Sequence, residues 1–117
     1  MISVLVPVYN TPYKWIKDCH ISIMSQTFKQ FEIVYVNDGS TSSETLKFLD
    51  EIRNNRFCNI IDLKENVGIA KALNIGLSHC KYDYVARMDS DDIMYSNRLW
   101  YQYNYMIKNP HVDLVGT

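Results

Sequence analysis

Three aspartates stand within four residues, directly after a segment that is predicted to be a strand. Asp89, Asp91 and Asp92 follow residues 82–88. Carboxylates this close repel one another, and a bound cation would offset the repulsion. Their hard oxygen ligands suit Mg²⁺ or Mn²⁺ better than Zn²⁺. A solvated acidic turn ahead of a helix is the alternative, but the position at a strand end favours a metal site.

Polar residues follow the other predicted strands in the same way. Tyr9 and Asn10 come after residues 3–8, Asp38 comes after residues 31–36, and Asn66 and Gly68 come after residues 57–63. In open α/β sheets, ligands bind beyond the carboxyl ends of the strands. Because four separate segments would bring polar groups to one rim of the sheet, their convergence predicts a ligand site there.

Each of these segments also has a simpler explanation. Asp38 is part of an Asp-Gly-Ser sequence that suits a turn, or its carboxylate accepts from the ring N–H of uracil while Tyr9 stacks on the ring. The Asn66-x-Gly68-x-x-Lys71 segment stands at a helix start, where free N–H groups favour phosphate. It is equally a loop glycine followed by a solvated lysine. No G-x-G-x-x-G or Walker A pattern is present.

The elements that must position these residues alternate between strands and helices. Apolar residues at helical spacing separate the four predicted strands. Thr11 is expected to be the N-cap of the first helix, with Pro12 at its first position. The alternation predicts an α/β fold, with a Rossmann-like, mostly parallel sheet and flanking helices.

Later helices and a final strand are also expected. Thr41-x-x-Glu44 predicts a capping box that opens the second helix, with Leu46 and Leu49 on its buried face. A last helix should run from near Ser96 to before Pro110. Residues 112–115 are expected to begin a further strand.

Composition restricts the class of protein. A chain of 117 residues fits one compact domain, and a net charge of -1 gives no support for nucleic-acid binding. Three cysteines without a C-x-x-C pair indicate reduced thiols. We find no signal peptide and no apolar run near the roughly 20 residues of a membrane span. These features predict a cytoplasmic protein, with a peripheral position at the membrane left open.

Taken together, the motifs resemble those of the inverting family 2 glycosyltransferases, which have the GT-A fold. The resemblance spans nearly the whole chain in the same order, and its segments are residues 3–10, 25–27, 32–41, 65–74 and 86–93, followed by Arg98-Leu99. It implies that Tyr9 stacks on the nucleobase and that Asp38 binds it. It also implies that Asp89-Ser90-Asp91 is a D-x-D motif, with Asp91 as the principal metal contact.

The expected donor-binding and metal-binding residues follow from these segments. Donor contacts are expected from Pro7, Tyr9, Asn10, Asp38, Asn66, Gly68, Lys71, Asp89 and Ser90, and metal contacts from Asp89 and Asp91. The resemblance implies a hexosyltransferase that uses Mn²⁺ or Mg²⁺ to transfer sugar from a UDP-sugar to a hydroxyl of a glycan or lipid-linked acceptor, with inversion. No catalytic base is assigned, since the family's base usually lies well downstream of the D-x-D motif. Residues 1–117 are therefore expected to be the nucleotide-sugar-binding part of a longer enzyme, which lacks its acceptor-binding region or needs a partner chain.

Two other classes of function remain open. The chain could be a non-catalytic nucleotide-sugar-binding module, which a reading frame with a downstream acidic motif would exclude. It could also be a nucleotidyltransferase, but those enzymes usually carry a glycine-rich, basic loop after the first strand. Here that position reads Tyr9-Asn10-Thr11-Pro12.

Overall fold

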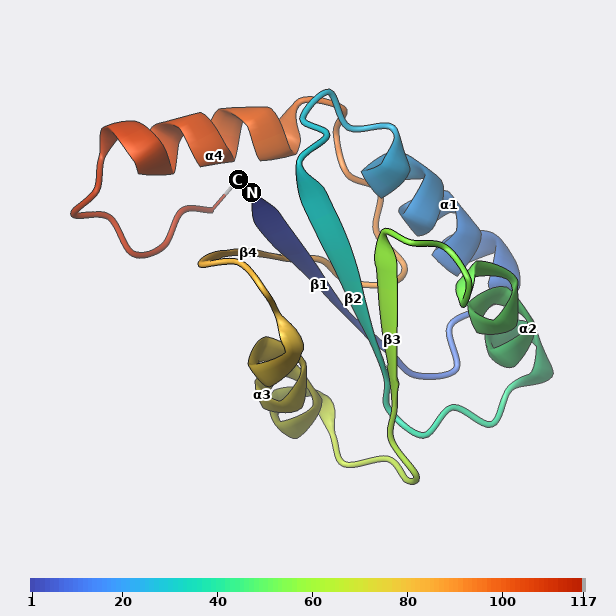
Figure 1. The fold of residues 1–117 in the computed structure, drawn as a ribbon. Coiled ribbons are helices and arrows are strands. Elements are labelled where there is room, and N and C mark those ends of the chain that lie inside the picture. The colour runs from blue at the N-terminus through green and yellow to red at the C-terminus, as the bar shows by residue number, and fades with distance from the viewer. Residues whose placement is uncertain (117) are drawn as a thin grey trace.

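A computed structural model describes residues 1–116 of the chain. The elements in chain order are β1 (Ile2–Val8), α1 (Tyr13–Met24), β2 (Phe31–Asn37), α2 (Ser43–Ile52), β3 (Cys58–Asp62), α3 (Ile69–His79), β4 (Tyr84–Arg87) and α4 (Arg98–Lys108). The strands form one sheet in the order β3-β2-β1-β4, and every pairing is parallel. The predicted α/β fold with a parallel sheet is confirmed (Figure 1).

The two central strands are buried on both faces, which explains their nearly continuous apolar sequence. Successive side chains of a strand point to opposite faces, so β1 and β2 contribute to two separate cores. The larger core holds Val4, Val6 and Tyr35 with residues of α1, α2 and α4. The smaller core holds Leu5 and Val34 with residues of α3.

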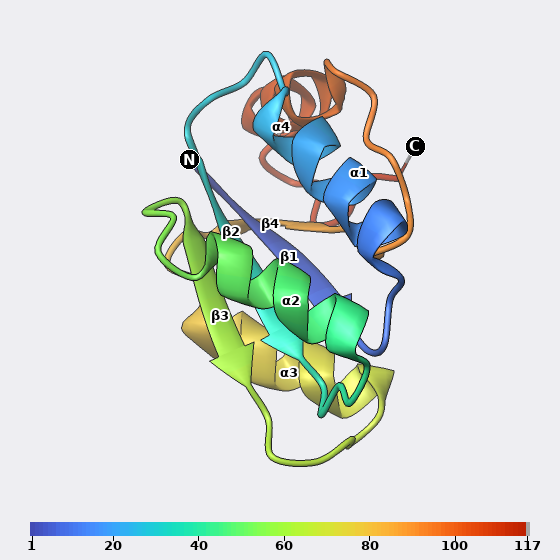
Figure 2. The ribbon, with the colours of Figure 1, turned by 90° about the vertical axis from the view of Figure 1, so that its right-hand side faces the viewer.

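The helices therefore lie on both sides of the sheet. Figures 1 and 2 show α1 and α2 against one face and α3 against the other. The connection from β1 to β2 crosses the first face, whereas the connection from β3 to β4 crosses the second. The crossover connections to the two neighbours of β1 therefore lie on opposite faces of the sheet. Open α/β sheets form a ligand crevice at such a point. The carboxyl ends of β1 and β4 meet at this point.

The structure corrects three details of the sequence prediction. The N-cap of α1 is Pro12 rather than Thr11, and the N-cap of α2 is Ser42 rather than Thr41. Neither helix has a side-chain capping bond. The hydroxyl of Thr11 bonds Ser90 instead, and that of Thr41 accepts from the side-chain amide of Asn10 at 3.5 Å. Leu46, expected on the buried face of α2, is exposed, and Thr45 is buried on that face instead. The side-chain hydroxyl of Thr45 donates to the carbonyl of Thr11 at 2.7 Å.

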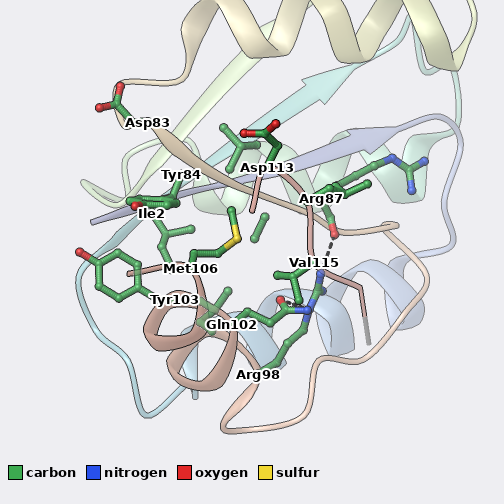
Figure 3. A pocket seen from close by; sticks show the side chains of 14 residues that line it. Ile2, Asp83, Tyr84, Arg87, Arg98, Gln102, Tyr103, Met106, Asp113 and Val115 are labelled. Atoms are coloured by element: carbon green, nitrogen blue, oxygen red, sulfur yellow. Dashed lines mark hydrogen bonds between the residues drawn. The ribbon is translucent and has the colours of Figure 1, made fainter. Parts of the chain in front are cut away.

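Residues 112–115 do not form the expected strand. No backbone hydrogen bond joins residues 113–116 to β4 in the described chain. Residues 113–115 instead line a cavity of about 310 Å³, together with residues of β4 and α4. Figure 3 shows Val115 beside Arg98 and Gln102 of α4, and Asp113 farther along the same cavity.

Two further observations concern the whole described chain. Its three cysteines are unpaired, as expected. None of the helices formed by residues 1–116 has the length and apolar character needed to cross a membrane.

Candidate functional site

A cleft of about 420 Å³ lies at the carboxyl ends of the strands. It is lined by Pro7, Val8, Tyr9, Thr11, Asp38, Asn66, Gly68, Ile69, Asp89, Ser90 and Asp91. All but two of the site residues expected from the sequence line this cleft. They come from four segments of the chain, which the parallel sheet brings to a single rim.

The acidic loop after β4 forms one wall of the cleft. Oxygens of Asp89, Asp91 and Asp92 all lie within 4.8 Å of one another. Asp91 and Asp92 are exposed, whereas Asp89 is half-buried and pairs with Arg87 at 3.1 Å. Within this loop, the N–H of Asp92 donates to the carbonyl of Asp89 at 3.1 Å. Arg87 pairs with only one of the three carboxylates, and the remaining negative charge fits a divalent cation.

Contacts with Thr11 and with Cys19 of α1 hold the acidic loop in place. The hydroxyls of Thr11 and Ser90 share a hydrogen bond of 2.6 Å. The thiol of Cys19 lies 3.5 Å from the carbonyl oxygen of Asp89. Burial, followed by the charges of the three aspartates, raises the pKa of Cys19 to about 12. The protonated thiol therefore donates to the backbone of the acidic loop.

The carboxylate of Asp38 closes the opposite side of the cleft. Its Oδ1 accepts from the N–H of Val67 at 2.7 Å, and its Oδ2 accepts from the N–H of Gly68 at 3.1 Å and from the side chain of Asn66 at 3.2 Å. Asp38 is 4% exposed. Each carboxylate oxygen can accept about two hydrogen bonds, so Oδ1 keeps capacity for one more donor. Asp38 thus has a structural task that its sequence position did not reveal.

Two glycines let this loop approach Asp38. Gly39 has φ +69, and a Cβ there would lie 2.5 Å from the backbone of Glu65 and Asn66. Gly68 has φ +92 and is the N-cap of α3. Both φ values belong to the region that glycine alone enters at little cost. The N-terminus of α3 therefore points into the cleft, with Gly68 and Ile69 on its surface.

Asn10 and Lys71 are the two expected site residues that do not line the cleft. Asn10 has φ 52, and its side-chain oxygen accepts from the backbone N–H of Thr41 at 2.8 Å and of Ser42 at 2.9 Å. It therefore braces the loop before α2. Lys71 is exposed on the first turn of α3. Thr11 is the polar lining residue that sequence reasoning missed, since its pattern suggested only a helix cap.

The chain is similar in sequence to known glycosyltransferases. Residues 3–117 match the family described as Glycosyl transferase family 2. The amylovoran biosynthesis glycosyltransferase AmsE of Erwinia amylovora is 40% identical over 122 residues, covering 99% of this chain and 44% of that protein. The bifunctional glycosyltransferase pgtA of Dictyostelium discoideum is 46% identical over 101 residues, covering 81% of this chain and 13% of that protein.

Solved structures share the fold. The crystal structure of S. aureus TarS 1-349 in complex with UDP-GlcNAc is 29% identical, with a TM-score of 0.82, and the match covers 99% of this chain and 36% of that one. The chain thus spans less than half the length of each of these relatives. The sheet and its flanking helices are those of the GT-A glycosyltransferases. Since the family match covers residues 3–117, the chain belongs to glycosyl transferase family 2.

Proposed function

We propose that this chain is the donor-binding part of a metal-dependent glycosyltransferase, and that its cleft holds a UDP-sugar beside Mn²⁺ or Mg²⁺. The observation that carries the proposal is the meeting of an acidic loop, a helix N-terminus and an exposed aromatic ring in one cleft. A nucleoside diphosphate needs a cation and N–H donors for its phosphates and a stacking face for its base. The acidic loop would hold the cation, the helix N-terminus would supply the N–H donors, and the aromatic ring would supply the stacking face. The bound UDP-GlcNAc of the related TarS structure supports the same donor class.

The base would lie at the end of β1. Tyr9 is 53% exposed at the cleft surface, which leaves its ring free to stack. The remaining capacity of Asp38 Oδ1 suits the N3–H donor of uracil. Cytosine has an acceptor at that position, and two acceptors would then face each other. We therefore propose that Asp38 favours uracil while it also holds the loop at residues 66–68.

The diphosphate would lie between α3 and the acidic loop. N–H groups of the first turn of a helix lack intrahelical partners and attract anions. Asp89 and Asp91 would hold the cation, and the cluster fits it because its carboxylate oxygens already converge within 4.8 Å. When bound, such a cation neutralises charge on the departing diphosphate. Asp89 would have to exchange its ion pair with Arg87 for this contact.

A donor-binding experiment tests this function. We expect UDP to raise the stability of the chain only when Mn²⁺ or Mg²⁺ is present, because the carboxylates and the diphosphate repel each other without a cation. At about 100 times its Kd, UDP should add about 2.7 kcal/mol to the free energy of unfolding. Differential scanning fluorimetry with Mn²⁺, and in parallel with excess chelator, measures the effect.

Two measurements test the metal site and the recognition of the base separately. Equal stabilisation by UDP in chelator would exclude the metal site. Calorimetric affinity for CDP in Mn²⁺ should be at least about tenfold weaker than for UDP, because an unpaired buried acceptor costs roughly 1–3 kcal/mol. Comparable affinities would remove Asp38 from base recognition and leave only its structural role.

Sugar transfer itself needs an acceptor site and a general base. We propose that a longer protein or a partner chain supplies both and that the product has inverted configuration at the anomeric carbon. The acceptor would be a glycan or a lipid-linked glycan. An assay of labelled-sugar transfer by this chain alone, beside a longer family member, tests the division of labour. Transfer by the short chain at the rate of the longer protein would place base and acceptor site within residues 1–117.

A further inference from the structure

A row of side chains, which starts just before α1 and continues along it into the following turn, holds both ends of the segment between β4 and α4. The row consists of Thr11, Cys19, Ser22, Gln26 and Thr27, and their partners are residues of the segment 89–99. Most of these bonds end on backbone atoms of that segment. The path of the acidic loop is therefore set by tertiary contacts with α1 as well as by its own sequence.

Gln26 makes more side-chain hydrogen bonds than the other members of the row. Its side-chain amide donates to the carbonyls of Tyr95 at 2.6 Å and Ser22 at 3.2 Å, and its Oε1 accepts from the N–H of Leu99 at 3.1 Å. Gln26 is fully buried, at 0% exposure. Both donor positions of the amide are thus used, and any substitution leaves buried backbone groups without partners.

The bond to Leu99 also caps α4. Leu99 is the second residue of this helix, and its N–H is one of the orphan donors of the first turn. The N-cap residue Asn97 makes no side-chain capping bond. Gln26 supplies that acceptor from a position far away in the sequence, so it fixes where α4 begins and where the preceding loop ends.

Two residues of α1 hold the two ends of the acidic loop. Ser22 Oγ accepts from the N–H of Met94 at 2.9 Å and donates to the carbonyl of Cys19 at 2.7 Å. The thiol of Cys19 in turn lies 3.5 Å from the carbonyl of Asp89. Asp91 and Asp92 therefore sit on a short span whose two ends are tied to one rigid helix.

We propose that Gln26 is a positioning residue for the acidic loop: by fixing the backbone at Tyr95 and Leu99, it helps to hold Asp91 close to Asp89 before a cation arrives. This inference rests on the proposed role of these aspartates as metal ligands. On a loop without these contacts, the mutually repelling carboxylates would move apart. The free energy needed to bring them together again would lower the affinity for the metal. Outer partners that orient metal ligands typically change affinity by about 10–100-fold.

The test compares Gln26→Met, which keeps length and removes every polar atom, with the parent chain. We expect Mn²⁺ affinity in the presence of UDP, followed by electron paramagnetic resonance of free Mn²⁺, to fall at least about tenfold. Amide hydrogen exchange in the metal-free protein should accelerate at residues 93–99. Parent-like affinity, or parent-like exchange in this segment, would overturn the proposal.

Milder variants protect the test against simple unfolding. Ser22→Ala removes the acceptor of the Met94 N–H, and we expect a smaller fall in Mn²⁺ affinity that Ser22→Thr restores. Leu49→Ala is the control, because Leu49 is fully buried on α2 and makes no side-chain hydrogen bond to the loop. It should lower global stability and leave Mn²⁺ affinity unchanged. An equal loss of affinity in Leu49→Ala would show that Gln26 acts only through overall stability.

Failure of the proposed function looks different. If the parent chain binds no Mn²⁺ with UDP, the assignment of Asp89 and Asp91 is wrong, and with it the link between Gln26 and metal affinity. The exchange experiment needs no metal and still reports whether Gln26 anchors the loop.

Discussion

Asp91→Asn is expected to abolish metal-linked nucleotide binding while the fold survives. Asp91 is exposed at the cleft, within 4.8 Å of the other two carboxylates. The substitution keeps nearly the same shape and removes one anionic ligand. Because losing even an outer partner of a metal ligand costs about 10–100-fold, we expect UDP affinity in Mn²⁺ to fall by at least ~100-fold. Isothermal titration of UDP into the protein with saturating Mn²⁺ measures this.

The apo protein should behave in the opposite way. Removal of one of three neighbouring charges relieves repulsion, so the thermal midpoint in chelator should stay the same or rise slightly. Asp83→Asn is the matched control, since Asp83 is an exposed aspartate that borders the other cavity. It makes the same change of charge and should leave UDP binding intact. Tight UDP and Mn²⁺ binding by Asp91→Asn would contradict the D-x-D assignment.

Gly39→Ala is expected to destabilise the chain by about 3 kcal/mol, from two additive causes. A non-glycine residue at φ +69 carries a strain of about 1–3 kcal/mol. The new Cβ would also lie 2.5 Å from backbone atoms of Glu65 and Asn66, and forcing extra atoms into a packed site costs typically 1–3 kcal/mol. Backbone cannot rotate away as a side chain can. Urea unfolding followed by circular dichroism measures the loss, which is a large part of the 5–15 kcal/mol typical of whole domains.

Two other glycines separate the causes. Gly68 has φ +92 but nothing within 4 Å of a built Cβ, so Gly68→Ala should show strain alone. Gly116 has open space and no positive φ, so Gly116→Ala should change stability by less than ~0.5 kcal/mol. We expect the order Gly39, Gly68, Gly116 in destabilisation. A Gly39→Ala loss no larger than that of Gly68→Ala would mean that the loop at residues 65–66 shifts freely, and Asp38 would then lose its partners at little cost.

The sequence by itself determined the fold class and the rim of the sheet where polar residues gather. Alternating strand and helix patterns are local, because side-chain periodicity needs only the neighbouring residues. Parallel pairing then forces the strand ends to one edge, so Tyr9, Asp38 and Asp89 could be placed together without coordinates. The family resemblance added the expected donor and metal, and the family match confirms its membership.

Only the tertiary structure decided which partners those residues have. Hydrogen bonds between segments distant in sequence leave no periodic trace, so neither the capture of the 66–68 loop by Asp38 nor the capping of α4 by Gln26 could be predicted. For the same reason Thr11, expected to cap α1, bonds Ser90 in the cleft instead. Residues 112–115 have the composition of a strand, yet a strand also needs hydrogen bonds to a partner edge, and no backbone bond joins residues 113–116 to β4 in the described part of the chain. Composition supplies the tendency to extend, whereas pairing depends on where the rest of the chain lies.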